Sequence, residues 1–214
     1  MRQIAQREDI RDLILDGVDV LLARYGYRKM TMEDLARQVG IGKGTLYLHF
    51  DSKEEVTLSH IDRIIERLVS QLQLIANESS TAEERIKKML TARVLYRFDS
   101  VRGYSQSLND LLSSLRAGLL LHRERHFENE ASVFAAVLEE GKTSGSFSFP
   151  DTETAAHTLI WATNSLLPYS LSPKELGKRK EIERQVSSIA DLLLSGLVAR
   201  PGNRAKQGSV KLVQ

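Results

Sequence analysis

Apolar residues recur at helical spacing along most of the chain, and this periodicity limits the possible fold more than any other feature. The clearest example is a continuous apolar stripe between Ile10 and Tyr25. Glycine and proline, which interrupt helices, number only 13 and 4 among 214 residues. No convincing segment alternates with the period of two that a strand requires, since the SFSF run at 146–149 is short and isolated. We therefore expect an all-α fold.

The composition narrows the compartment and the class of protein. The chain has no cysteine, which excludes a disulfide scaffold, thiolate catalysis and cysteine-bound zinc. Its first residues, MRQIAQREDIRD, hold no apolar signal core. No apolar run reaches the roughly 20 residues that a membrane-spanning helix needs. We expect a cytoplasmic protein with no membrane partner.

Residues typical of helix ends divide the N-terminal part into short helices. Gly26 is expected to end the first helix, and Gly40-Ile41-Gly42 separates the second from the third. Three helices, the second among them, are predicted to start at a serine or threonine. In each case an acidic residue follows three positions later, as in a capping box. These pairs are Thr31 and Asp34, Ser52 and Glu55, and Thr81 and Glu84.

The C-terminal part is predicted to hold longer helices. Helical spacing covers about 105–141 without placing its internal breaks, a loop covers 141–150, and another helix covers about 151–167. Ser172-Pro173-Lys174-Glu175 places proline at a first helical position and so predicts the start of the last helix. After Pro201 the residues turn to Gly, Asn, Lys and Gln, and we expect 201–214 to form a mobile tail.

The segment from Thr31 to Val56 has the pattern of a helix-turn-helix, with two short helices around a glycine-containing turn. Leu35, Val39 and Leu46 can point inward and fix the angle between these helices. The outer side of the third helix then carries donors for phosphates and base edges beside apolar groups for thymine methyls, as a recognition helix in a major groove requires. The residues on or near this side are Lys43, Thr45, Tyr47, Leu48 and His49.

The run from Ile10 to Val56 resembles the N-terminal domain of the TetR family of bacterial transcription regulators. The matching residues are Gly26-Tyr27, Thr31, Asp34-Leu35-Ala36, Gly40-Ile41, Lys43-Gly44-Thr45-Leu46-Tyr47, His49-Phe50 and Ser52-Lys53-Glu54-Glu55. Gly42 departs from the pattern, because the family usually has serine there, so the third helix lacks a side-chain N-cap. Glycine at such a position costs only roughly a few tenths of a kcal/mol relative to serine.

The resemblance implies a function and a division of the chain. Residues 1–50 would form a three-helix DNA-binding domain, and residues 51–200 a larger helical ligand-binding and dimerisation domain. A homodimer would place two recognition helices in successive major grooves of a palindromic, double-stranded operator. A small-molecule effector bound in the larger domain would release the DNA. On family grounds the regulator is expected to be a repressor rather than an activator.

The resemblance also implies roles for single residues. Thr31, Lys43, Tyr47 and Lys53 would contact phosphates, and Gly44 would allow close approach to the DNA. Leu48 and His49 would lie nearest the bases. Other interpretations stay open, since Tyr47 could be a core aromatic, His49 could pack against the first helix, and both lysines could be ordinary surface residues.

One feature favours a different function. Residues 1–55 carry slightly more acidic than basic side chains, whereas DNA-binding surfaces are usually basic. The alternative is a helical interaction protein whose helix-turn-helix no longer binds DNA.

Catalytic, nucleotide and metal sites have little support. Gly40 to Thr45 lacks the first glycine of a phosphate-binding loop and the hydroxyl residue after its lysine. His122 and His126 lie four apart and share a helical face, but no third ligand is evident, so a charged surface helix is the better interpretation. No nucleophile or acid–base pair has a recognisable signature. We expect no enzyme activity, no metal and no cofactor.

The larger domain offers two further predictions. Helices near 152–167 and 172–198 carry more apolar residues than one core-facing stripe needs, and the resemblance places the subunit interface there; these residues include Leu159, Ile160, Leu166, Ile189, Leu192, Leu193 and Leu197. An effector cavity with a mostly aromatic lining and few charges would suit a largely apolar or aromatic compound. Its candidate residues are Arg93, Tyr96, Phe98, Tyr104, Phe127, Phe134, His157, Trp161 and Asn164, although Trp161 could equally be a dimer contact or plain core.

Overall fold

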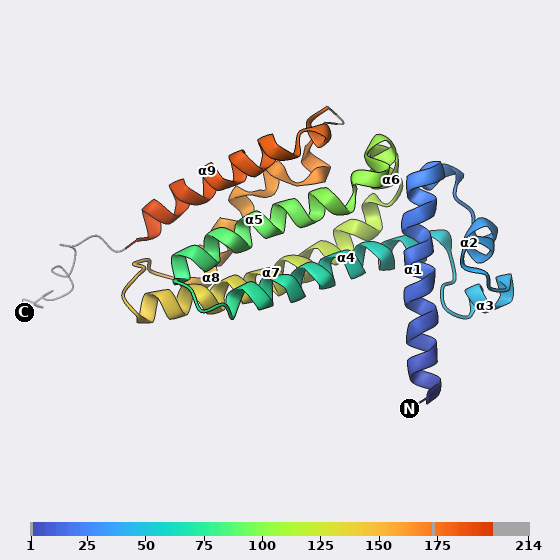
Figure 1. Cartoon of the computed structure of the whole chain (residues 1–214), viewed down its shortest axis with the longest axis horizontal. Coiled ribbons are helices and arrows are strands. Elements are labelled where there is room, and N and C mark those ends of the chain that lie inside the picture. The colour runs from blue at the N-terminus through green and yellow to red at the C-terminus, as the bar shows by residue number, and fades with distance from the viewer. Residues whose placement is uncertain (1, 173, 199–214) are drawn as a thin grey trace, which may run out of the picture.

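The computed structural model describes residues 2–172 and 174–198, and these residues are almost entirely helical (Figure 1). Their only β-type pairing is an isolated bridge between Phe147 and Val198. The expected tail at 201–214 lies outside the described residues. None of the helices in the described ranges is long and apolar enough to cross a membrane.

The N-terminal helices form a three-helix unit at one end of the molecule (Figure 1). They are α1 (Arg2–Lys29), α2 (Met32–Val39) and α3 (Lys43–Tyr47). Gly17 lets α1 and α2 approach closely, because a Cβ atom there would lie 2.5 Å from Cγ1 of Val39. Gly26 has a φ of +69°, so the helical path is interrupted there as expected, and one more turn then continues to Lys29.

The remaining helices form the body. They are α4 (Lys53–Ala76), α5 (Ala82–Ser100), α6 (Leu108–Ser114), α7 (Arg116–Thr143), α8 (Thr152–Ala162) and α9 (Arg179–Leu197). Short 3₁₀ turns at Arg102–Ser107, Asn164–Leu166, Pro168–Ser170 and Glu175–Gly177 connect them. Figure 1 shows α4 running from the N-terminal unit along the length of the body.

The three helix starts predicted from capping residues are confirmed. The Thr31 hydroxyl accepts a hydrogen bond from the Asp34 N–H at 3.1 Å, and the Ser52 hydroxyl accepts one from the Glu55 N–H at 3.0 Å. Thr81 and Glu84 form the complete reciprocal capping box. The Glu55 carboxylate differs slightly from expectation, since it accepts from the N–H of Asp51.

Three predicted helices in the C-terminal part have wrong bounds. The stretch from 105 to 141 is divided by Leu115, which is buried between α6 and α7. Ser172 and Glu175 do form a capping contact, but only a 3₁₀ turn follows it, and α9 starts at Arg179. The helix predicted to reach Leu167 ends at Ala162, where Thr163 turns its hydroxyl to the preceding carbonyls.

A buried ion network joins three helices of the body. Arg93 on α5 donates from Nε to Glu130 on α7 at 2.7 Å and from Nη1 to the Thr163 hydroxyl at 2.8 Å. Arg97 donates to the second oxygen of Glu130. Burial alone would raise the pKa of Glu130, but the Arg97 and Arg93 guanidiniums outweigh it and hold that pKa below its usual value. Because Arg93 and Glu130 are fully buried, each depends on the other for its charge to be compensated.

Polar contacts join α4 to α1 and so fix the N-terminal unit on the body. Arg63 is buried and donates from Nη1 to the Asp12 carbonyl at 3.0 Å and from Nη2 to the Asp16 carboxylate at 2.7 Å. One turn earlier, His60 is buried at the same junction, with Nε2 3.7 Å from Oδ1 of Asp19. Burial, with a smaller effect of the Arg63 cation, lowers the pKa of His60 to about 4.

The depressed pKa of His60 predicts a specific loss of stability in mild acid. The unfolded chain binds a proton at this histidine below roughly pH 6.5, whereas the folded protein does not do so until about pH 4. The free energy of unfolding should therefore fall as the pH drops through this window, by about 2 kcal/mol between about pH 7 and about pH 5 from this residue alone.

Chemical denaturation of the wild type and of His60→Gln at both pH values measures this contribution, because glutamine does not titrate. The wild type should lose about 2 kcal/mol more than the variant over the interval. Equal losses in the two proteins would show that His60 is not held neutral at the junction.

Candidate nucleic-acid interface and the cavity behind it

The third helix presents one apolar face to the protein and another face to solvent. Leu46 and Phe50 are buried against the N-terminal core, whereas Leu48 is 75% exposed and Tyr47 is 43% exposed. Tyr47 is therefore a surface residue rather than a core aromatic. A bulky apolar side chain as exposed as Leu48 is available to the thymine methyls of a major groove.

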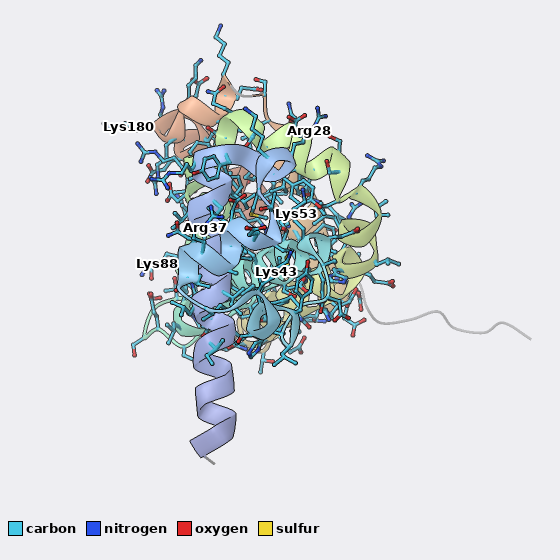
Figure 2. The ribbon with its side chains drawn as sticks, turned by 90° about the vertical axis from the view of Figure 1, so that its right-hand side faces the viewer. Arg28, Arg37, Lys43, Lys53, Lys88 and Lys180 are labelled. Carbon is cyan, nitrogen blue, oxygen red and sulfur yellow. The ribbon has the colours of Figure 1, made fainter. Side chains whose placement is uncertain are left out.

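Lys43 and Gly44 lie at the start of the same helix and are exposed. No carboxylate pairs with Lys43 in the part of the chain that the structure describes, and a Cβ atom on Gly44 would meet nothing within 4 Å. Figure 2 views the molecule from this end and shows Arg28, Arg37 and Lys43 over the N-terminal unit. Arg28 and Arg37 differ from Lys43 because they pair with Asp110 and with Glu33 and Asp34 respectively.

The remaining candidate residues are partly engaged inside the protein. Lys53 is half-buried, donates to the Tyr27 carbonyl at 3.1 Å, and lies 4.5 Å from the Tyr27 ring centroid. Lys53 therefore connects the start of α4 to the end of α1. The sequence did not indicate this role. Thr31 is exposed but uses its hydroxyl to cap α2, and Thr45 and His49 are half-buried.

Arg11 is a positioning residue that the sequence prediction missed. Its guanidinium lies 4.3 Å from the centroid of the Phe50 ring and donates to the His49 carbonyl at 3.3 Å. It also reaches the Ser59 hydroxyl on α4 at 3.3 Å. Arg11 thus connects α1 to the end of the third helix and to α4, and these long-range contacts left no signal in the local sequence.

Several acidic residues of 1–55 are engaged in contacts within the protein. Asp12, Asp16 and Asp19 meet Arg63 and His60 at the junction with α4. Asp34 and Glu55 take part in the capping of α2 and α4. Residues 42–50 contain no acidic side chain. Part of the acidic charge of residues 1–55 is therefore used in these contacts, and the segment 42–50 itself carries none of it.

A cavity of about 410 Å³ lies in the body between α4, α6 and α7. Its lining is mainly aliphatic, but three arginines also reach it: Arg97, Arg116 and Arg123. Arg97 is committed to Glu130. No carboxylate pairs with Arg116 or Arg123 among the described residues, and the Arg123 guanidinium lies 5.0 Å from the Phe127 ring centroid. The cavity can therefore offer two uncompensated cations to a ligand.

Only Tyr104 and Phe127 of the predicted lining residues border this cavity. The lining therefore differs from the aromatic one with few charges that the sequence predicts, because the other predicted aromatic residues face the core or solvent. Phe98 and Phe134 are buried in the core, and Tyr96 packs partly against it. His157 stacks on Trp161 at the surface, with ring centroids 5.7 Å apart.

Arg93 and Asn164, the polar candidates for the cavity lining, form a hydrogen bond with each other. Nη2 of Arg93 donates to Oδ1 of Asn164 at 2.9 Å, and the rest of the guanidinium serves the buried network with Glu130. Arg97, one turn along α5, borders the cavity in place of the predicted Arg93. Arg93 and Arg97 share one face of α5, so what separates them is one turn along the helix axis, and apolar periodicity alone does not define which turn meets the cavity.

The predicted interface helices are less apolar on their surface than the sequence indicates. Leu159, Ile160 and Leu166 are buried within the chain itself, so they are not surplus to its core. Leu192 on α9 is 75% exposed and Trp161 on α8 is 59% exposed, while Ile189, Leu193 and Leu197 are partly buried against the core. The exposed apolar surface of these helices is therefore limited to a few large side chains.

Comparison with known proteins supports the arrangement of the N-terminal unit and of the body. Residues 14–59 match the family described as bacterial regulatory proteins, tetR family. The chain is 21% identical over 188 residues to the fatty acid metabolism regulator protein of Bacillus subtilis, covering 86% of this chain and 93% of that protein. It is also 28% identical over 81 residues to the IcaR negative transcriptional regulator of the biofilm operon in Staphylococcus aureus, covering 38% of this chain and 44% of that protein.

Solved structures share the whole fold. A TetR-family transcriptional regulator from Pectobacterium atrosepticum superposes with a TM-score of 0.71 at 19% identity, over 92% of this chain and 98% of that one. The fatty acid degradation regulator FadR from Bacillus halodurans gives a TM-score of 0.59 at 23% identity, over 89% of this chain and 97% of that one. Together with the geometry of the helix-turn-helix, these likenesses lead to one conclusion: the chain belongs to the TetR family of bacterial regulatory proteins and is a DNA-binding transcription regulator.

Proposed function

We propose that this regulator is a repressor that binds a palindromic operator as a homodimer and is released by a small-molecule effector. In this proposal residues 1–50 bind DNA, and residues 51–200 bind the effector and form the dimer. The main observation in support of DNA binding is the exposed face of α3. Lys43, Tyr47 and Leu48 are accessible there, and residues 42–50 contain no acidic side chain. The repressor role draws on the Staphylococcus relative, which is named a negative regulator.

The proposed contacts differ between the two ends of α3. Lys43 and Tyr47, together with Thr31 at the start of α2, would bind phosphates, which position the protein without specifying sequence. Gly44 would let the backbone approach the DNA. Leu48, with Thr45 and His49 beside it, would meet the base edges. Lys53 would act mainly by holding α4 to α1, since its ammonium already binds the Tyr27 carbonyl.

The proposed dimer would use the outer surfaces of α8 and α9. Trp161 and Leu192 are the large exposed apolar side chains on these helices, and aromatic residues are enriched in subunit interfaces. A homodimer is needed because one α3 covers only a half-site, and the second half-site lies one helical turn away.

The effector is proposed to be an amphipathic anion with an aliphatic chain. The cavity supplies aliphatic walls from α4, α6 and α7, and Arg116 and Arg123 supply cations that no carboxylate of the described chain compensates. Two of the similar proteins are named as regulators of fatty acid metabolism or degradation, which is compatible with a ligand of this kind.

The DNA contacts predict the effect of removing one charge from α3. Lys43→Gln should weaken binding to a mixed-sequence duplex and reduce the slope of log K against log salt by about one, because one phosphate contact is lost. Gly44→Ala should weaken binding as well, while the fold tolerates it, since nothing lies within 4 Å of the new Cβ. Fluorescence anisotropy at several salt concentrations measures both effects.

Lys180→Gln is the matched control for Lys43→Gln. Lys180 is an exposed lysine on α9, and Figure 2 shows it far from the α3 surface. The same loss of charge there should leave the salt slope unchanged. If Lys43→Gln and Lys180→Gln had equal slopes, α3 would not be the DNA-binding surface.

The cavity predicts which compounds stabilise the free protein. Dodecanoate, below its micelle concentration, should raise the melting temperature and lower the DNA affinity, and 1-dodecanol should do so far less because it offers no charge to the arginines. Arg123→Gln should weaken dodecanoate binding by about tenfold, which is a typical loss for one charge-assisted hydrogen bond. Thermal-shift titrations measure both comparisons.

Arg184→Gln serves as the control, because it removes an exposed arginine of α9 that does not border the cavity. Equal stabilisation by the acid and the alcohol, or equal losses in the two arginine variants, would show that an anionic group is not recognised in this cavity.

A further inference from the structure

Three side chains with metal-binding atoms converge between α4 and α7. Oδ1 of Asp62 lies 2.9 Å from Nδ1 of His122 and 2.8 Å from Nε2 of His126. The three atoms lie within 4.8 Å of one another. His122 and His126 share a face of α7 because they are four residues apart, and α4 supplies the carboxylate from 60 residues away in the sequence. This carboxylate is the third group with a metal-binding atom, and the sequence did not reveal it.

The arrangement is not fully satisfied as a set of hydrogen bonds. Nε2 of His126 is buried, and within the described residues it has no hydrogen-bond partner of acceptable geometry, although Asp62 touches it. The two imidazole rings are nearly perpendicular, at 86°, so both cannot lie in the plane of one carboxylate. A buried nitrogen that faces a carboxylate without forming a good hydrogen bond is a candidate to coordinate an ion.

A further contact orients the Asp62 carboxylate. Its second oxygen, Oδ2, accepts from Nη2 of Arg125 at 3.3 Å. A hydrogen bond to the non-ligating oxygen is a common way to orient a metal-binding carboxylate, although the Arg125 cation also competes with an ion for the charge of Asp62.

We propose that Asp62, His122 and His126 bind a divalent first-row transition-metal ion, with water completing its coordination. Two imidazole nitrogens and one carboxylate oxygen suit zinc and its neighbours, whereas magnesium and calcium prefer oxygen ligands throughout. Tetrahedral bonds of about 2.0–2.2 Å would require the nitrogen and oxygen atoms to separate by only about 0.5 Å from their present contacts. The site does not rest on the proposed repressor function or on the proposed effector.

The ion would connect two regions of the protein. His126 also borders the cavity, and Asp62 precedes Arg63, which holds α4 to α1. An ion at this position would therefore fix α4 against α7 beside the junction with the N-terminal unit.

Zinc competition against a chromogenic chelator tests the proposal on the full chain without a histidine tag. We expect one Zn²⁺ per chain with a dissociation constant in the micromolar range or below, and no comparable binding of Mg²⁺. Asp62→Asn and His126→Gln should each weaken Zn²⁺ binding by roughly a hundredfold, because each removes a ligand atom. Zinc should also raise the melting temperature of the wild type and not that of Asp62→Asn.

His157→Gln is the matched control, because it removes a histidine that pairs with Glu128 at 3.1 Å outside the cluster. The chain has five histidines and no cysteine, so few other strong ligands compete. His122→Gln provides an independent ligand variant at the most exposed of the three side chains, should Asp62→Asn unfold by far-UV circular dichroism. Absence of micromolar Zn²⁺ binding, or binding that the ligand variants leave intact, would overturn the proposal.

Discussion

The contact of Arg63 with α1 determines how the DNA-binding unit is held on the rest of the protein. This buried guanidinium lies on α4 and binds both the Asp12 carbonyl and the Asp16 carboxylate, so α1 has a fixed position along α4. The helix α4 begins directly after the turn that follows α3, and its residues Ile61, Ile64 and Ile65 border the body cavity. A shift of α4 caused by a ligand would therefore also move α1, against which α2 and α3 pack, because Arg63 holds α1 to α4. This is a physical basis for coupling between two sites, which requires one element that both sites can bias.

The sequence predicted what local interactions determine. The caps at Thr31, Ser52 and Thr81 could be recognised because a hydroxyl and the N–H three residues later belong to the same turn. The exposed face of α3 could be predicted from its apolar pattern, because residues one turn apart share a face of the helix. The start of α9 was misplaced because Ser172 and Glu175 cap only a 3₁₀ turn, and local capping does not determine how far a helix continues.

The features that the sequence did not predict depend on contacts between distant segments. Arg93 and Arg97 are one turn apart on α5 and both bind Glu130 on α7, but only Arg97 borders the cavity. Asp62 joins His122 and His126 only when α4 and α7 pack together. The overall charge of residues 1–55 was misleading for the same reason, because Asp12 and Asp16 compensate an arginine that lies outside this range.

Recognition of a symmetric DNA sequence by two copies of α3 is the central claim. Selection of bound duplexes from a random-sequence pool, followed by sequencing, tests it without assuming any operator sequence. Binding by a symmetric dimer predicts enrichment of an inverted repeat whose half-site centres lie one helical turn, or about 10 base pairs, apart. Enrichment of a single unrepeated motif would contradict binding by a symmetric dimer, and no enrichment over the starting pool would contradict sequence recognition by α3.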